Sequence, residues 1–324
     1  MPAILTFSLT LLAMIAFAGN SLLCRLALKH TGIDAASFTS IRIVSGALVL
    51  WLIVRLRGYR RSRRLSALPT TPQAFPTLVG TSHIHVGRLW GSVAGSWPSA
   101  LALFVYAACF SYAYVSLPAA VGALLLFGAV QATMIGYGLW AGERLQLRQA
   151  VGLIFACAGL VGLVLPGLML SDKISPGMTA PPLPASLLML AAGCAWGIYS
   201  LRGKGVADPT GETMGNFLRA APIAIALSAM ALPWASLGRN GVSYAIASGV
   251  LTSGVGYAIW YTALRGLKAT SAAAVQLSVP VFAAIGGIAF LGESISLRLL
   301  IASTAILGGI ALVIVETAAE RAPR

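Results

Sequence analysis

The sequence predicts an all-α polytopic membrane protein with ten transmembrane helices, arranged as two inverted five-helix repeats. Three observations predict this: long apolar runs, a phrase that occurs twice 150 residues apart, and basic residues that gather in alternate loops. Of the 324 residues, 58% are hydrophobic and only 9% are charged. A soluble domain carries about 25% charged residues. So few charges could not cover a soluble surface.

The apolar runs are each long enough to cross a bilayer, whose core of about 30 Å needs roughly 20 helical residues. The first run lacks a basic leader and a cleavage site, so we expect it to remain as a helix. The four cysteines predict packing positions rather than a metal site. In chain order, the predicted helices lie at 4–28, 36–55, 98–117, 120–141, 149–166, 185–201, 214–234, 242–264, 269–291 and 298–315.

The repeated phrase is FLGESISLR at 290–298, which echoes WAGERLQLR at 140–148. A shift of 150 residues places Gly142 on Gly292, Glu143 on Glu293 and Arg148 on Arg298, in otherwise uncharged regions. Self-similarity at a fixed separation indicates that a structural unit occurs twice in the fold. We therefore predict a first repeat at 1–168, a linker at 169–184, a second repeat at 185–316 and a tail at 317–324.

Basic residues assign the two sides, because cytoplasmic loops collect Lys and Arg. The net charge of +14 is interpreted as topology rather than as a nucleic-acid surface. The run RLRGYRRSRR at 55–64 should follow the second helix on the cytoplasmic side, which places both termini inside and the linker 169–184 in the periplasm. The second repeat then enters from the opposite side, and Ser294 replaces Arg144 because its loop faces outward.

Residues 57–97 have no counterpart in the second repeat and are predicted to be a basic cytoplasmic or interfacial loop, whether ordered or not. His83 and His85 lie within it, and two histidines without a nearby cysteine or carboxylate make a weak metal site. We predict no metal and no cofactor.

Several stretches resemble a known family. They are FSYAYVSLPAAVGALLLFGAVQATM (110–134), AAGCAWGIYSLRGKG (191–205), SGVGYAIWYTALRGL (253–267) and AVQLSVPVFAAIGGIAFLGE (274–293). They resemble the drug/metabolite transporter superfamily, EamA type, and are most similar to its bacterial aromatic-amino-acid exporters. The resemblance implies ten helices around a central cavity, export of small metabolites, and a place in the bacterial inner membrane.

Inverted repeats in transporters place the substrate near the midplane, between the halves. No acidic residue is expected at that depth, which argues against a proton-driven pump. Arg42 and Arg219 are expected to snorkel from helix ends. Pro280 should bend the ninth helix and serve as a hinge. A cavity for a neutral or zwitterionic solute is predicted from the uncharged polar and aromatic residues at depth: Asn20, Tyr106, Phe110, Tyr112, Gln131, Trp196, Tyr199, Tyr257, Trp260, Tyr261 and Gln276.

The sequence therefore favours a secondary transporter that exports amino acids, aromatic ones included, by facilitated diffusion or exchange. A carrier of drugs, other metabolites or lipid-linked substrates is the nearest alternative, and a non-transporting scaffold or sensor is the alternative of another class. An intramembrane enzyme is disfavoured because all three histidines fall in predicted loops. The sequence leaves open whether the protein is a monomer or a homodimer.

Overall fold

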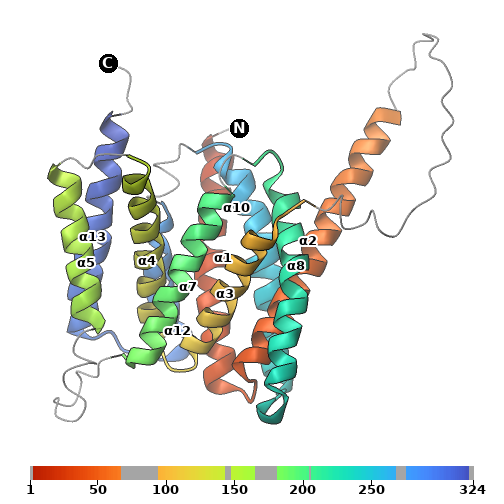
Figure 1. Cartoon of the computed structure of the whole chain (residues 1–324), viewed down its shortest axis with the longest axis horizontal. Helices are drawn as coiled ribbons and strands as arrows, with labels where there is room; N and C mark the ends of the chain where they lie inside the picture. The colour runs from red at the N-terminus through yellow and green to blue at the C-terminus, as the bar shows by residue number, and fades with distance from the viewer. Residues whose placement is uncertain are drawn as a thin grey trace, which may run out of the picture.

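A computed structural model describes residues 3–66, 94–142, 147–164, 181–203, 206–267 and 275–320. These residues form helices joined by short turns, which confirms the predicted all-α class (Figure 1). His83, His85, Glu143, most of the predicted loop 57–97 and most of the linker 169–184 lie outside the described residues.

Ten helical spans follow one another through the described residues, as predicted. The first repeat contributes α1 (Ala3–His30), α2 (Ala35–Ser66), α3 (Trp97–Tyr114), α4 (Ala119–Trp140) and α5 (Leu147–Val164). The second contributes α7 (Leu183–Arg202), α8 (Pro209–Met230), one span made of α9 (Arg239–Ala247), the π-helix η3 (Ser248–Val255) and α10 (Gly256–Leu264), then α12 (Ser278–Leu291) and α13 (Leu297–Glu320). A short 3₁₀ turn, η2 (Leu232–Trp234), follows α8.

Several of these helices meet the length and apolarity that a membrane crossing requires. Within the described residues, five do so outright: 4–30, 35–57, 119–140, 183–202 and 239–264. Three shorter apolar helices lie at 150–163, 278–291 and 297–312. The chain is therefore a multi-pass membrane protein.

Several helix ends differ from the predicted ones by a few residues, and three of the differences move charged residues into helices. The arginine run does not follow the second helix, because α2 continues through it to Ser66, and arginine is a good helix former. The seventh span begins earlier, at Pro209, where proline suits the first helical position, so Glu212 lies in the first turn of α8 rather than in a loop. The last helix continues to Glu320, so Glu316 and Glu320 belong to α13 rather than to a tail.

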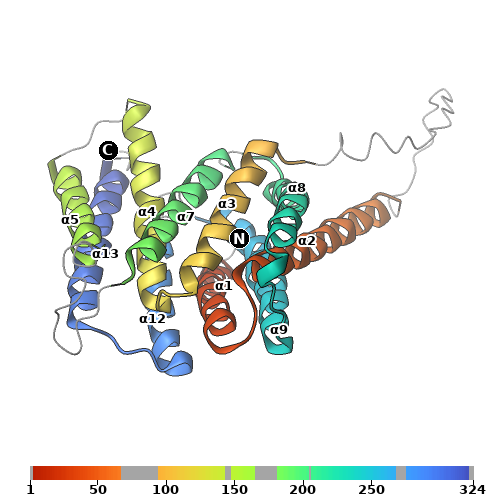
Figure 2. The same cartoon turned by 60° about the horizontal axis from the view of Figure 1, so that its bottom comes forward.

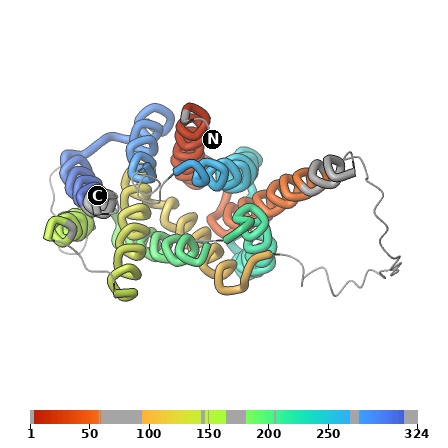
Figure 3. Tube along the Cα trace, turned by 90° about the horizontal axis from the view of Figure 1, so that it is seen from above, coloured from red at the N-terminus to blue at the C-terminus, as the bar shows by residue number. Residues whose placement is uncertain are grey.

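A pair of glycines shows the relation between the two repeats at the level of single residues. A Cβ added to Gly159 of α5 would meet Ala302, Ala305 and Ile306 of α13. A Cβ added to Gly309 of α13 would meet Gly152, Phe155 and Ala156 of α5. Each of these positions differs from its counterpart by 150, as a twofold axis between the helices requires. The two helices lie side by side at one edge of the molecule (Figures 1 and 3).

Other helices follow the same rule: each packs against the counterparts of the helices that its own counterpart contacts. Helix α1 packs against α10 and α12, and its counterpart α7 packs against α3 and α4. Helices α2 and α8, and likewise α4 and α12, pack against their own counterparts. This packing confirms the predicted inverted repeat.

The two membrane faces can be named from the chain ends. Helix α1 begins and α13 ends on one face, which we call the terminal face; the turns between α1 and α2 and between α3 and α4 lie on the other, which we call the opposite face (Figure 1). Figure 2 turns the opposite face toward the viewer. Helix α4 is buried on nearly all sides over 119–131, so the core lies around it.

Candidate functional site

Nine aromatic side chains are joined by ring contacts through the middle of the bundle. The ring of Trp196 lies at their centre, with centroids 4.8 Å from Tyr106, 5.2 Å from Tyr257 and 5.4 Å from Tyr199. Rings at such separations attract one another beyond simple burial. Both repeats contribute to the cluster, whose members are Phe17, Tyr106, Phe110, Tyr114, Trp196, Tyr199, Phe217, Tyr257 and Trp260.

A small cavity lies among these rings. Its volume is about 20 Å³, enough for one water molecule but not for an amino acid, so a solute could enter only if the helices moved apart. Tyr106 lies halfway along α3, which places the cavity near the middle of the membrane. Five helices and the π-helix line it, through Phe17, Asn20, Ser21, Tyr106, Phe110, Leu126, Phe127, Trp196, Thr252, Ser253 and Tyr257.

Asn20 connects the polar groups of this cavity. Its amide nitrogen donates to the Tyr106 hydroxyl at 3.2 Å, and its carbonyl oxygen accepts from the hydroxyls of Ser248 at 2.7 Å and Thr252 at 3.1 Å. Ser248 and Thr252 belong to the π-helix η3, a form that occurs mostly as single turns at functional sites. The amide of Asn20 thus ties α1 to α3 and to the second repeat.

Arg42 extends this network, and the prediction that it snorkels from a helix end is wrong. Its side chain is only 2% exposed and points into the bundle. Its Nη2 donates to the Tyr106 hydroxyl at 3.0 Å and its Nε to the Ser253 hydroxyl at 3.1 Å. The guanidinium carbon lies 5.2 Å from the Tyr106 ring centre and 5.0 Å from that of Phe110, within the range of cation–π attraction. Arg42 does not reach the membrane surface because it lies on the side of α2 that faces α3.

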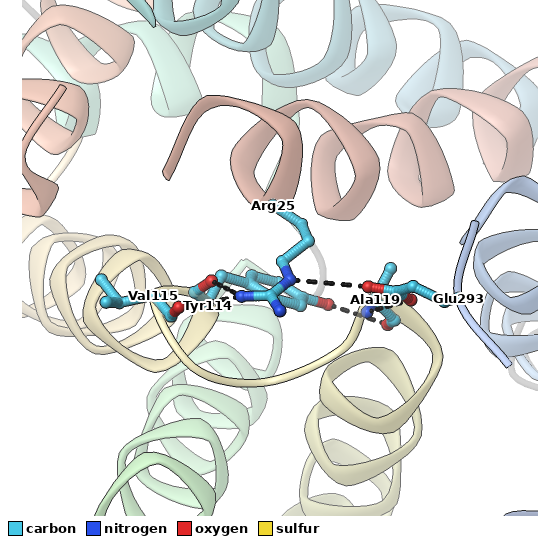
Figure 4. A network of polar contacts seen from close by, with 5 residues as sticks. All are labelled: Arg25, Tyr114, Val115, Ala119 and Glu293. Carbon is cyan, nitrogen blue, oxygen red and sulfur yellow. Dashed lines mark hydrogen bonds and ion pairs between the residues drawn. The ribbon is translucent and has the colours of Figure 1, made fainter. Parts of the chain in front are cut away.

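A second polar network closes the bundle near the opposite face (Figure 4). Arg25 of α1 donates through Nη1 to the carbonyls of Tyr114 at 2.9 Å and Val115 at 2.8 Å. Its Nε lies 3.5 Å from an oxygen of Glu293, whose other oxygen accepts from the Ala119 amide at 2.8 Å. Glu293 therefore links the second repeat to the first at the start of α4.

The chain was compared with known families and proteins. Residues 183–315 match the model of the EamA-like transporter family. The whole chain is similar to a Pseudomonas aeruginosa protein named "Uncharacterized protein PA1977", with 49% identity over 97% of this chain and 96% of that one. The chain belongs to the EamA-like transporter family. A solved structure described as "Crystal structure of protein" shares its fold, with a TM-score of 0.55 and 17% identity over 94% of this chain and 98% of that one.

Within this EamA-like fold, the predicted site residues fall into three groups. Asn20, Tyr106, Phe110, Trp196 and Tyr257 line the central cavity. Trp260 lies just beside it, with its ring 5.9 Å from that of Phe17. The others lie elsewhere: Tyr112 is 40% exposed on the outside of α3, and Gln131 and Gln276 are not among the residues that line a described cavity.

Tyr199 and Tyr261 line a separate hollow nearer the terminal face. There the Tyr199 hydroxyl accepts from the amide nitrogen of Asn216 at 3.4 Å. Glu212 and Arg202 also line this hollow, where α7 ends and α8 begins. It is smaller than the central cavity, at about 10 Å³. Both hollows are lined in part by α3, α7 and the α10 segment, and this one lies at the ends of those helices nearer the terminal face.

A third and wider hollow has a different character. It measures about 660 Å³, opens outward between α2, α8 and α9, and is lined by aliphatic side chains with two serines. It offers no charged or aromatic group to orient a polar solute. Of the two hollows that combine rings, an amide and hydroxyls, the central cavity is the larger and lies near the middle of the membrane, and it is the candidate site of this EamA-like protein.

Pro280 lies in the first turn of α12, where its missing amide proton leaves no gap in the helix. The helix is interrupted directly before it, at Leu277.

Arg219 lies on α8, the counterpart of α2, and has another partner than Arg42: its Nη1 donates to the Ala94 carbonyl at 2.9 Å, which holds the segment before α3. Among the described residues, no three side chains of His, Cys, Asp or Glu lie close enough together to hold a metal ion.

Sequence reasoning missed several residues of the site. Phe17, Ser21 and the hydroxyls of Thr252 and Ser253 line the cavity without having been selected. The one available signal was Arg42, a charge inside an apolar run, which was noted but placed at the membrane surface.

Proposed function

We propose that this protein exports amino acids, aromatic ones included, through the bacterial inner membrane by alternating access. The single observation that carries the proposal is the central cavity, which lies between the repeats and combines a ring cluster with the Asn20 amide. Rings offer apolar contact to a substrate side chain, and the amide and hydroxyls offer hydrogen bonds. Secondary transporters bind substrate at this place in the fold.

The closed cavity fits one stage of such a cycle. Its small volume requires the repeats to separate before substrate enters, and the break before Pro280 gives α12 a place to bend. The network of Arg25 and Glu293 joins the repeats at the opposite face, so opening that face requires their ion pair to break. The hollow between α7 and α8 offers a route toward the terminal face.

The terminal face is assigned to the cytoplasm. Arg55 and Arg57 lie where α2 leaves the apolar span on this face, followed by the other arginines of the run, and such residues collect inside. Both termini are then cytoplasmic. Because no carboxylate lines the central cavity, we expect facilitated diffusion or exchange rather than proton-driven transport.

The test is uptake of labelled phenylalanine and tryptophan into proteoliposomes that hold the purified protein, with and without an imposed pH gradient. We expect uptake above that of protein-free liposomes without the gradient. Uptake that needs the gradient would contradict the facilitator mechanism. Absence of uptake for all amino acids would contradict the amino-acid proposal and would point to another solute class of the same family.

A further inference from the structure

Arg42 carries a buried positive charge that the described residues do not neutralise. Within them, no carboxylate lies within ion-pair distance of its guanidinium; the ion pair found there joins Arg25 to Glu293. Its hydrogen-bond partners, Tyr106 and Ser253, are both neutral hydroxyls. Its third nitrogen, Nη1, is buried and has no hydrogen-bond partner at all.

Such an arrangement is costly and therefore points to function. An arginine cannot shed its proton to escape burial. A buried charge without a counter-ion is strongly unfavourable in a protein interior, and more so within a membrane. The rings of Tyr106 and Phe110 offset part of that cost by cation–π attraction but supply no negative charge.

Arg42 lies directly behind the wall of the central cavity and is not itself among the lining residues. Three of the residues that Arg42 contacts, Tyr106, Phe110 and Ser253, line that cavity. The Tyr106 hydroxyl accepts hydrogen bonds from both Arg42 and Asn20, so its own proton remains available for donation. An acceptor that entered the cavity as it widened would find two donors on adjacent groups.

We propose that Arg42 binds the carboxylate of the transported solute, with the Tyr106 hydroxyl as second donor. The class of substrate is then a monocarboxylate with an apolar or aromatic body, which the rings around Trp196 would hold. Guanidinium and carboxylate match in charge and in planar geometry. Asn20 keeps the Tyr106 hydroxyl in place from the other side. This inference deepens the proposed function and rests on the same cavity.

The chemistry favours a carboxylate over a phosphate. A phosphate group carries more charge and is normally met by several cations. Among the residues that the structure describes, none that lines this cavity is charged, and Arg42 contacts the wall through Ser253. The rest of the cavity wall is mostly rings and apolar side chains, with one amide and a few hydroxyls as its polar groups. A single carboxylate on an apolar body satisfies both the charge and the surface.

The experiment measures thermal stabilisation of the purified protein in detergent by three ligands: phenylalanine, phenylalaninamide and 3-phenylpropionate. The amide keeps the ring but lacks the carboxylate, and the propionate keeps the carboxylate but lacks the amine. For the wild-type protein we expect both carboxylates to bind at least about tenfold more tightly than the amide, as a charge-assisted hydrogen bond implies. Equal stabilisation by phenylalanine and its amide would overturn the proposal, even if no variant folds.

Two variants then place the effect at Arg42. Arg42→Gln should abolish the preference for carboxylates while leaving the melting temperature no lower, because it removes an unpaired buried charge. Arg42→Lys should keep part of the preference. Arg55→Gln removes the same charge from an exposed position on the same helix and should behave as wild type. A carboxylate preference that survives in Arg42→Gln would overturn the assignment.

The ligand set separates this proposal from the proposed function. Stabilisation by 3-phenylpropionate but not by phenylalanine, lost in Arg42→Gln, would support the carboxylate site and contradict amino-acid export. Transport of phenylalanine with no preference over its amide would support amino-acid export and contradict the carboxylate site.

Discussion

Arg25 and Glu293 form an ion pair across the two repeats, with Nε and Oε1 3.5 Å apart and side chains only 8% and 10% exposed. Each partner also binds backbone at the turn between α3 and α4, through the Tyr114 and Val115 carbonyls and the Ala119 amide. One acid thus joins the end of α12 to two elements of the first repeat (Figure 4).

Replacing Glu293 by glutamine should destabilise the protein. The change leaves the buried Arg25 without its counter-ion, and loss of one partner of a buried pair costs about 3 kcal/mol or more. We expect a clear fall in the melting temperature in detergent. Asp208→Asn is the control, because Asp208 is exposed and its side chain makes no capping hydrogen bond. Equal melting temperatures for both variants would show that the ion pair does not hold the repeats together.

Two neighbouring glycines of α13 should respond to alanine in opposite directions. At Gly309 a methyl group would overlap the backbone of Gly152 and Ala156, which should cost about 1–3 kcal/mol. At Gly308 nothing lies within 4 Å, and alanine should stabilise the helix by about 0.5–1 kcal/mol. Melting temperatures of the two variants check the close approach of α5 and α13. A stable Gly309→Ala protein would contradict it.

Asp34 ties the turn before α2 to the turn before α9. Its oxygens accept from the amides of Ser37 at 2.9 Å and Ser236 at 3.0 Å. Partial burial acts to raise the pKa of this carboxyl, but hydrogen bonds from Ser37, Ser236 and Ala36 outweigh it and lower the pKa below its ordinary value of 3.8. The ionised form is therefore the one that the fold stabilises.

The pH dependence follows from that sign. The contribution of Asp34 is fully present above the unfolded pKa and is lost as the pH falls through the lower folded pKa. Asp34→Asn should therefore melt below wild type at about pH 7, by roughly 1 kcal/mol of stability, and the gap should close below about pH 4. A gap that persists unchanged in acid would mean that the charge is not what matters.

Trp196 should determine the preference for aromatic substrates. Its replacement by leucine removes the central ring, and ring pairs contribute about 0.5–1.5 kcal/mol beyond burial. Competition against labelled phenylalanine uptake should show the preference for tryptophan over leucine falling roughly two- to tenfold. Trp140→Leu alters a tryptophan that is 84% exposed and should leave the preference unchanged. Parallel behaviour of the two variants would place the substrate elsewhere.

The helices and their repeat could be predicted because the signal is redundant. Ten apolar runs, the Gly-Glu-Arg phrase and the alternation of basic loops all indicate the same arrangement. The contacts of Gly159 and Gly309 then reproduce the 150-residue shift that aligned the sequence. Helix ends were less predictable where charged residues continue a helix, as in α2.

The site was only partly predictable. The sequence shows how deep in the membrane a residue lies more readily than which way its side chain points. Tyr106 and Phe110 are four residues apart and share the inner face of α3, whereas Tyr112 lies about 200° around the helix from Phe110 and faces outward. That spacing could have separated them. The direction of Arg42 depends on how α2 packs against α3, and the π-helix that presents Ser248 and Thr252 has no pattern in the sequence that predicts it.

The central claim is that the repeats must separate at the opposite face for transport to occur. Ala119 of α4 and Gly287 of α12 belong to different repeats, and a Cβ at Gly287 would lie 3.6 Å from that of Ala119, a separation that suits a disulfide. The same Cβ would lie 2.7 Å from an oxygen of Glu293, so the Glu293 side chain must shift to admit the cysteine. We would measure phenylalanine flux for the Ala119→Cys/Gly287→Cys protein, with the exposed Cys157 and Cys194 replaced by serine. The account predicts no flux when the pair is oxidised and restored flux after reduction. Equal flux in both states would contradict it.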